Sequence, residues 1–178
     1  MNILEFVEDP HTILRKQRIE ETVAKYPDVK IIQEIAGLTS QEEATDKISN
    51  TISSLGDKLN GMIATGYVPT VATSLILTDL KNTNISFVGI DTDQAVLDAI
   101  KNGNVTGTFG QNSYFHGYRA ALYLKYLADG FVPKEDYVFI NSGGPIVSKD
   151  NLDTFNDMLW DDIQKAADKM ADYFQPKQ

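Results

Sequence analysis

Alternation of short apolar runs with longer stretches of helical periodicity is the feature that most constrains the fold of this chain. Strands are expected at Ile3–Val7, Val29–Ile35, Gly61–Ala64, Ile85–Ile90, Val105–Phe109 and Tyr137–Ile140. Helices are expected at Thr12–Lys25, Ser40–Leu55, Val71–Leu80, Gln94–Lys101 and Tyr114–Leu127. This order of elements predicts an α/β fold, with a mainly parallel sheet flanked by helices.

Three local signals define helix ends. Ser40 followed by Glu43 is a capping-box pattern, and Asp93 is placed to cap a helix that begins at Gln94. Asn102-Gly103 is a C-terminal stop, because glycine readily adopts the left-handed conformation that ends many helices.

Composition excludes several classes of protein. The formal charge of −9 disfavours nucleic-acid binding, which needs a cationic surface to displace counterions. The absence of cysteine excludes disulfides, thiolate catalysis and cysteine-bound zinc. No apolar run approaches the roughly 18 residues of a membrane span, and the first residues lack the pattern of a signal peptide.

The loops after the predicted strands are the place to look for a site, because ligands of open parallel sheets bind beyond the carboxyl ends of the strands. These loops read "EDPHT", "TGYVPT", "DTDQ" and "GQNSY". Asp91-Thr92-Asp93 also matches, as a remote alternative, the paired aspartates of haloacid-dehalogenase-type phosphohydrolases. That class needs its pair after the first strand and a supporting lysine, and neither is found in the matching place.

A binding site explains the loop residues better than an enzyme does. Polyhydroxy ligands need planar polar groups that reach adjacent hydroxyls, and aromatic faces for their C–H surface. The candidate ligand-binding residues are Arg15, Tyr67, Asp91, Gln111 and Asn112, with Tyr114 beside them. Each of these residues alone also fits an ordinary structural role. His11 and His116 have no partner at metal-ligand spacing, so neither a metal nor a cofactor is expected.

Five ordered motifs carry a resemblance to a known family. They are "RKQRI…AKYPDVKII", "GMIATGY", "FVGID", "IKNGNVTGTFGQNSYFHGY" and "IVSKDN", all within residues 1–151. This order resembles the second half of the type I periplasmic binding proteins of the ribose- and galactose-binding group. The resemblance implies one lobe of that fold, a non-catalytic sugar-binding role and no cofactor.

Three site residues carry over from the family motifs. The family arginine lies eleven residues before the tyrosine of the "YP" motif, and Tyr26 places it at Arg15. The aspartate of the "VGID" motif is Asp91, and the glutamine after the strand that leaves the lobe is Gln111. This chain departs from the family pattern at two places. Many family members have Asn-Asp where this chain has Gly66-Tyr67, and they have a glycine where this chain has Arg18.

The resemblance also implies partners. Family members have an N-terminal lobe that closes the ligand cleft, and nothing in these residues corresponds to it. In the family, the helix within residues 112–130 belongs to that other lobe. Its apolar side chains are therefore expected to lack their usual neighbours and to be covered by a second copy, in a homodimer, or by a separate N-terminal lobe. Residues 1–150 are therefore expected to form a C-terminal-lobe-like ligand-binding domain, and residues 151–178 an amphipathic helix reaching Phe174.

The implied function is ligand capture for an ABC-type sugar importer, with an ABC permease as partner in the full protein. The same fold serves as the effector domain of lactose-repressor-like regulators and as the sugar-sensing subunit of membrane sensors. An importer component would be extracytoplasmic, whereas a regulator would be cytoplasmic. A signal peptide or a DNA-binding helix pair in the full gene would distinguish them.

Overall fold

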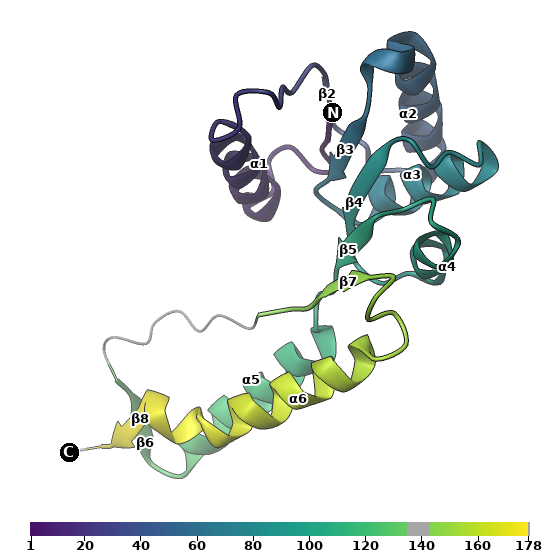
Figure 1. Cartoon of the computed structure of the whole chain (residues 1–178). Coiled ribbons are helices and arrows are strands. Elements are labelled where there is room, and N and C mark those ends of the chain that lie inside the picture. Colours follow the sequence, from purple (N-terminus) through teal and green to yellow (C-terminus); the bar gives the residue numbers. More distant parts are fainter. Residues whose placement is uncertain (135–142, 178) are drawn as a thin grey trace. The chain divides into compact units, whose positions relative to one another are not determined.

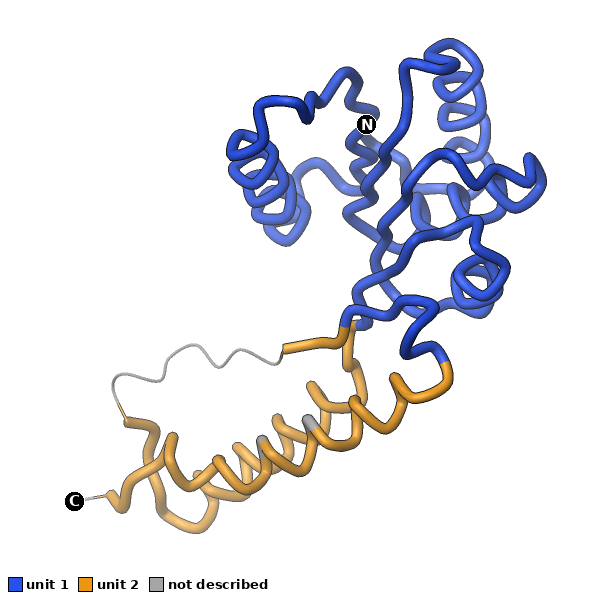
Figure 2. Tube along the Cα trace, in the orientation of Figure 1, with its two compact units in different colours: residues 1–110, 146–152 blue, residues 111–145, 153–178 orange. Residues whose placement is uncertain are grey.

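The protein divides into two compact units. The structure, a computed structural model, describes residues 1–134 and 143–177, without the side chains of residues 162 and 166. The first unit consists of Met1–Gly110 and Ile146–Leu152, and the second of Gln111–Pro145 and Asp153–Gln178 (Figure 2).

The first unit is built on a six-stranded sheet in the order β2-β1-β3-β4-β5-β7 (Figure 1). The strands are β1 (Asn2–Ile3), β2 (Glu34–Ile35), β3 (Gly61–Ala64), β4 (Ser86–Ile90), β5 (Gly107–Phe109) and β7 (Ile146–Ser148). Pairings among β2, β1, β3, β4 and β5 are parallel, and β7 adds to β5 in the antiparallel sense. The predicted α/β class with a mainly parallel sheet is confirmed.

Four helices accompany this sheet: α1 (Pro10–Val23), α2 (Gln41–Leu55), α3 (Tyr67–Asp79) and α4 (Gln94–Asn102). The predicted helix ends are confirmed. The Ser40 side chain accepts from the Glu43 N–H at 3.3 Å, and the Asp93 side chain accepts from the Ala95 N–H at 2.9 Å. Gly103 ends α4 at φ 82°, in the left-handed region that suits glycine.

The core lies on one face of the sheet, under α2, α3 and α4 (Figure 1). Ile3, Met62 and Phe87 are buried there and pack with apolar side chains of these helices. Helix α1 lies on the opposite side of the sheet and buries only Thr12. The two faces are thus unequally covered.

The second unit is a helix pair with a small sheet. Helix α5 (Ser113–Ala128) packs on α6 (Phe155–Asp168), and β6 (Phe131–Pro133) pairs antiparallel with β8 (Phe174–Pro176), which follows a 3-10 turn at Met170–Tyr173. Phe115 and Ile163 are buried between the helices. No helix in the part of the chain that the structure describes is long and apolar enough to cross a bilayer.

Several element bounds differ from those predicted. Strand β1 ends at Ile3 and β2 begins only at Glu34, so both are shorter than their apolar runs. The tail helix ends at Asp168 rather than at Phe174, because Phe174 pairs in β8 and its ring stacks on Tyr126 at 4.8 Å between centroids. Strands β6, β7 and β8 were not predicted, and the strand predicted at Tyr137–Ile140 lies outside the described residues.

Candidate ligand-binding site

Polar side chains of the first unit gather at the carboxyl ends of β3 and β4. Thr65 and Gly66 follow β3, and Asp91 follows β4 directly. Parallel pairing of these two strands brings their ends to the same edge of the sheet. Residues far apart in the sequence reach this edge from the segment after β1, from α1 and from the N-cap of α4.

Arg15 reaches the edge from α1. Its guanidinium Nη1 donates a hydrogen bond of 2.7 Å to the backbone oxygen of Thr65, and its side chain is half-buried. A guanidinium carries five N–H donors in a planar fork, and this bond helps to fix the orientation of the group. Helix α1 itself is held at its start by Asp9, whose carboxylate accepts from the Thr12 N–H at 2.9 Å.

Glu5 is a site residue that sequence reasoning missed. Its carboxylate accepts from the backbone N–H groups of Tyr67 at 3.1 Å and Val68 at 3.2 Å, at the N-terminus of α3. The helix dipole and its free N–H groups favour a negative charge there. Gly66 makes the approach possible, because a Cβ atom built on it would lie 1.8 Å from Glu5 Oε2. Two features of the sequence could have indicated this contact: an acidic residue shortly after β1 and a glycine directly before α3.

Tyr67 and Asp93 are joined directly across the edge. The Tyr67 hydroxyl donates to Asp93 Oδ2 at 2.7 Å, while Asp93 Oδ1 caps α4. This hydrogen bond is the main reason why the pKa of Tyr67 is raised. The negative charge of Asp93 is the next cause, and the charge of Asp91 adds to the effect. Tyr67 remains 46% exposed, so part of its side chain is open to solvent.

Asp91 occupies an uncommon backbone conformation for a residue other than glycine, with φ 76°. Its N–H donates to the Phe109 oxygen at 2.8 Å, and its own carbonyl oxygen accepts from the Thr108 hydroxyl at 2.7 Å. These bonds tie the residue to β5 and hold a conformation that costs on the order of 1 kcal/mol. Strained residues of this kind concentrate at binding and catalytic sites.

Gln111 and Asn112 begin the second unit. Asn112 is buried, and its amide is already engaged: Oδ1 accepts from the Phe115 N–H at 2.9 Å, and Nδ2 donates to the Leu159 oxygen at 3.1 Å. Asn112 therefore caps α5 and links it to α6. Gln111 is half-buried, and the exposed Tyr114 ring lies 5.2 Å from that of Trp160, centroid to centroid.

The sequence-predicted residues thus fall into two groups. Arg15, Tyr67 and Asp91 lie at one edge of the sheet, whereas Gln111 and Asn112 belong to the other unit. Across residues 1–134 and 143–177 there is no group of three or more His, Asp or Glu side chains that could hold a metal ion. His11 bonds locally, with Nδ1 3.4 Å from Asp9 Oδ1.

The edge offers hydrogen-bond donors and acceptors side by side. A guanidinium, a phenol and three carboxylates of Glu5, Asp91 and Asp93 meet there, of which Glu5 and Asp93 also cap helices. Such an arrangement can bind hydroxyl groups, each of which donates one hydrogen bond and accepts others.

Comparison with known proteins identifies relatives of one kind. The family described as "Periplasmic binding protein domain" matches residues 3–130. The chain is 29% identical over 163 residues to a xylitol-binding protein of Mycolicibacterium smegmatis, covering 92% of this chain and 46% of that protein. The chain thus spans about half the length of this curated relative.

Solved structures show the same fold at lower identity. An arabinose-binding protein from Geobacillus stearothermophilus matches with a TM-score of 0.74 at 19% identity, covering 86% of this chain and 55% of that one. A solute-binding protein of an ABC transporter from Bacillus halodurans, solved with myo-inositol, matches with a TM-score of 0.70 at 18% identity over 88% and 54% of the two chains.

Proposed function

Because the chain belongs to the periplasmic binding protein domain family, we propose that it is a non-catalytic ligand-binding lobe for a sugar or sugar alcohol. In the full protein this lobe would serve the solute-binding component of an ABC-type sugar importer, with an ABC permease as its partner. That component acts outside the cytoplasm. The predicted family itself is confirmed by the match over residues 3–130.

The observation that carries this proposal is the convergence of Arg15, Tyr67 and Asp91 at the end of β3 and β4. The three side chains come from α1, α3 and the loop after β4, and the Arg15–Thr65 and Tyr67–Asp93 bonds hold two of them in place. Preformed polar groups lose little entropy when a ligand binds, which favours recognition of a small polar molecule. Tyr67 supplies the apolar face that sugar C–H groups need.

The charges of the edge favour a neutral ligand. Glu5 occupies the N-terminus of α3, where a phosphate or carboxylate of a ligand would otherwise bind. Asp91 and Asp93 add two more carboxylates against the single guanidinium of Arg15. An anionic sugar would meet net repulsion, whereas hydroxyl groups fit both signs of charge. Xylitol, the ligand in the name of the curated relative, is a neutral molecule of this class.

Tight binding requires the second face of the cleft. We propose that a second lobe closes over the ligand and that Gln111, at the start of the second unit, contributes near the hinge. Asn112 then acts as the structural cap that orients α5. The lobe alone leaves much of the ligand in water, so it should bind weakly.

The proposal is tested by NMR titration of the chain with xylitol. A dissociation constant on the order of 1 mM is expected for the lobe alone, with shifts at Arg15, Tyr67 and Asp91. Asp91→Ala should weaken binding by roughly 10- to 100-fold, because hydrogen bonds to charged groups contribute about 1.5–3 kcal/mol. Asp46→Asn, on the exposed side of α2, is the matched control. Shifts confined to the second unit, or equal binding by Asp91→Ala, would contradict this site.

A further inference from the structure

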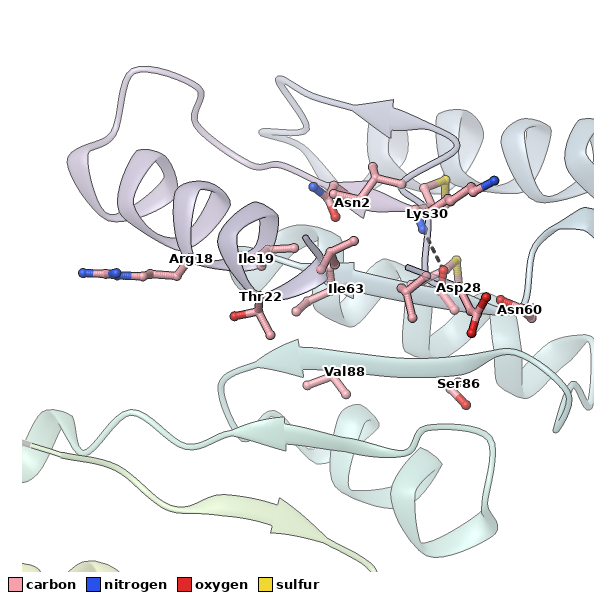
Figure 3. A pocket seen from close by; sticks show the side chains of 16 residues that line it. Asn2, Arg18, Ile19, Thr22, Asp28, Lys30, Asn60, Ile63, Ser86 and Val88 are labelled. Atoms are coloured by element: carbon pink, nitrogen blue, oxygen red, sulfur yellow. Dashed lines mark hydrogen bonds between the residues drawn. The ribbon is translucent and has the colours of Figure 1, made fainter. Parts of the chain in front are cut away.

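A pocket lies in the first unit, on the sheet face that α2, α3 and α4 leave uncovered. Its volume is about 660 Å³, and it is lined by α1, by the segment at residues 28–31 and by β1, β3 and β4 (Figure 3). Small-molecule sites commonly have volumes of about 300–1,000 Å³. Gly61 and Ser86, at the starts of β3 and β4, line the pocket, so it reaches the amino ends of the strands.

The strand register explains which strand side chains line this pocket. Asn2 pairs with Ile63, and Ile63 with Val88, so these three side chains form one row across the sheet. Ile3, next to Asn2, points to the opposite face and belongs to the core. Ile19 of α1 faces the row from the other side of the pocket (Figure 3), and Val23 of the same helix also lines the pocket. The lining is therefore mixed, because aliphatic side chains of the strands and of α1 lie beside polar and charged residues such as Arg18, Asp28 and Lys30.

One buried polar group in the pocket has no partner. Asn2 is 2% exposed, and its Nδ2 makes no hydrogen bond although the side chain lines the pocket. An unsatisfied buried donor costs about 1–3 kcal/mol, so a partner that enters the pocket recovers that cost. The backbone N–H of the same residue is satisfied by the Gln33 oxygen at 3.0 Å. The Asn2 group that lacks a hydrogen-bond partner is thus the side-chain Nδ2, not the backbone N–H.

We propose that this pocket binds a compact, mainly apolar small molecule whose carbonyl or hydroxyl oxygen accepts a hydrogen bond from Asn2 Nδ2. The aliphatic row of Ile63 and Val88 and the facing Ile19 bury the apolar body. A polypeptide segment fits less well, because each of its residues would bring a backbone donor and an acceptor that both need partners, whereas a compact small molecule brings few polar groups.

The site is distinct from the sugar-binding edge. The pocket includes the amino ends of β3 and β4, whereas Thr65 and Asp91 follow their carboxyl ends. Its chemistry also differs, because the proposed sugar-binding edge gathers three carboxylates and a guanidinium, whereas the pocket includes a row of aliphatic side chains from β3 and β4. A ligand for one is therefore a poor ligand for the other.

The test uses two fluorinated probes on the 178-residue chain. We choose para-fluoroacetophenone, which has a carbonyl, and para-fluoroethylbenzene, which matches it in shape but has no acceptor. Fluorine NMR gives the affinities, and two-dimensional NMR of the protein locates the probes. The wild-type chain should bind the ketone about five-fold more tightly than the hydrocarbon, with shifts at the Asn2 side-chain amide and at Ile63 and Val88.

Two variants separate the hydrogen bond from the cavity. Asn2→Leu should bind both probes equally, because the donor is gone while an apolar wall remains. Ile63→Trp should abolish saturable binding of both by filling the volume, and Ile19→Phe provides a second filling variant from α1. Equal affinities of wild type for the two probes would overturn the proposal, since water would then satisfy Asn2. Shifts located outside the pocket, or no saturable binding, would overturn it as well.

Discussion

At the scale of single residues, Tyr67 provides a titration that reports the geometry of the proposed sugar-binding edge. The hydrogen bond to Asp93 and the charges of Asp93 and Asp91 favour the neutral phenol, which raises the pKa of Tyr67. Stabilisation of the fold by this bond is present below the unfolded pKa of about 10 and is lost as pH rises through the higher folded value.

We predict that an ultraviolet difference titration of wild type against Tyr67→Phe shows one tyrosine ionising above the ordinary range. Asp93→Asn should bring that pKa down toward the ordinary value, because it removes the charge while an asparagine side chain can still cap α4. Asp98→Asn, further along α4, serves as a control and should leave the titration unchanged. A Tyr67 that titrates normally in wild type would mean that the bond to Asp93 does not form in solution.

The sequence predicted some of these residues and missed others for a physical reason. Tyr67 and Asp91 were predicted as site residues because residues after parallel strands meet at one edge, and Arg15 was predicted from its place in the family motif. The role of Glu5 depends on the N–H groups of Tyr67 and Val68, more than 60 positions away. Such a contact is set by tertiary packing and has no local pattern.

At the scale of elements, the start of α3 depends on the close fit of Glu5 against Gly66. The backbone of Gly66 is extended, a conformation that any residue can adopt. The obstacle to a larger residue at this position is the Glu5 side chain, which a Cβ atom on residue 66 would overlap. We predict that Gly66→Ala lowers the free energy of unfolding by about 1–3 kcal/mol, because the new Cβ displaces the carboxylate from the helix N–H groups.

Urea unfolding with a double-mutant cycle checks this prediction. In a Glu5→Ala background the same Gly66→Ala change should cost little, since the clashing group is gone. Gly117→Ala is the matched control: a Cβ there meets nothing within 4 Å, and alanine is the better helix former. Additive costs in the cycle would show that Glu5 and Gly66 are not coupled.

Helix α5 depends on the side chain of Asn112, which caps its N-terminus and bonds to α6. We predict that Asn112→Ala destabilises the second unit by about 1–3 kcal/mol, because it removes both the α5 cap and the bond to the Leu159 oxygen. Asn112→Asp should lose less, since it keeps the acceptor for the Phe115 N–H. Hydrogen exchange of the Phe115 amide measures the loss; unchanged protection in Asn112→Ala would rule out the capping role.

The predicted element boundaries agree best with the structure where the hydrophobic pattern is long or where a helix cap is present. Helices α2 and α4 begin where Ser40 and Asp93 predicted, because those side chains satisfy free N–H groups locally. Strands β6 and β8 were missed because each has three residues and forms only by pairing with the other, more than 40 positions away. The tail helix was predicted too long for the same reason, since ring contacts of Phe174 with Tyr123 and Tyr126 outweigh its helical spacing.

At the scale of the whole molecule, apolar side chains of α5 remain in solvent. Leu124 is 66% exposed and Leu127 is 41% exposed, while Leu122 is half-buried. Each Å² of apolar surface left in water forgoes about 25 cal/mol, so a few such side chains amount to several kcal/mol. That sum is a large part of the 5–15 kcal/mol that typically stabilises a domain.

We therefore predict that the chain associates through α5, either with a second copy or with a separate lobe that covers this helix. A cyclic dimer would bury the same face on both copies. Leu124→Asp should dissociate the assembly, because it places a charge in the apolar contact, whereas Asp157→Asn on α6 should not, because it changes only an acidic surface position. Light scattering at tens of micromolar, a range in which weak dimers form, gives the mass. A wild-type chain that is monomeric by itself and does not bind a separately made N-terminal lobe would refute this prediction.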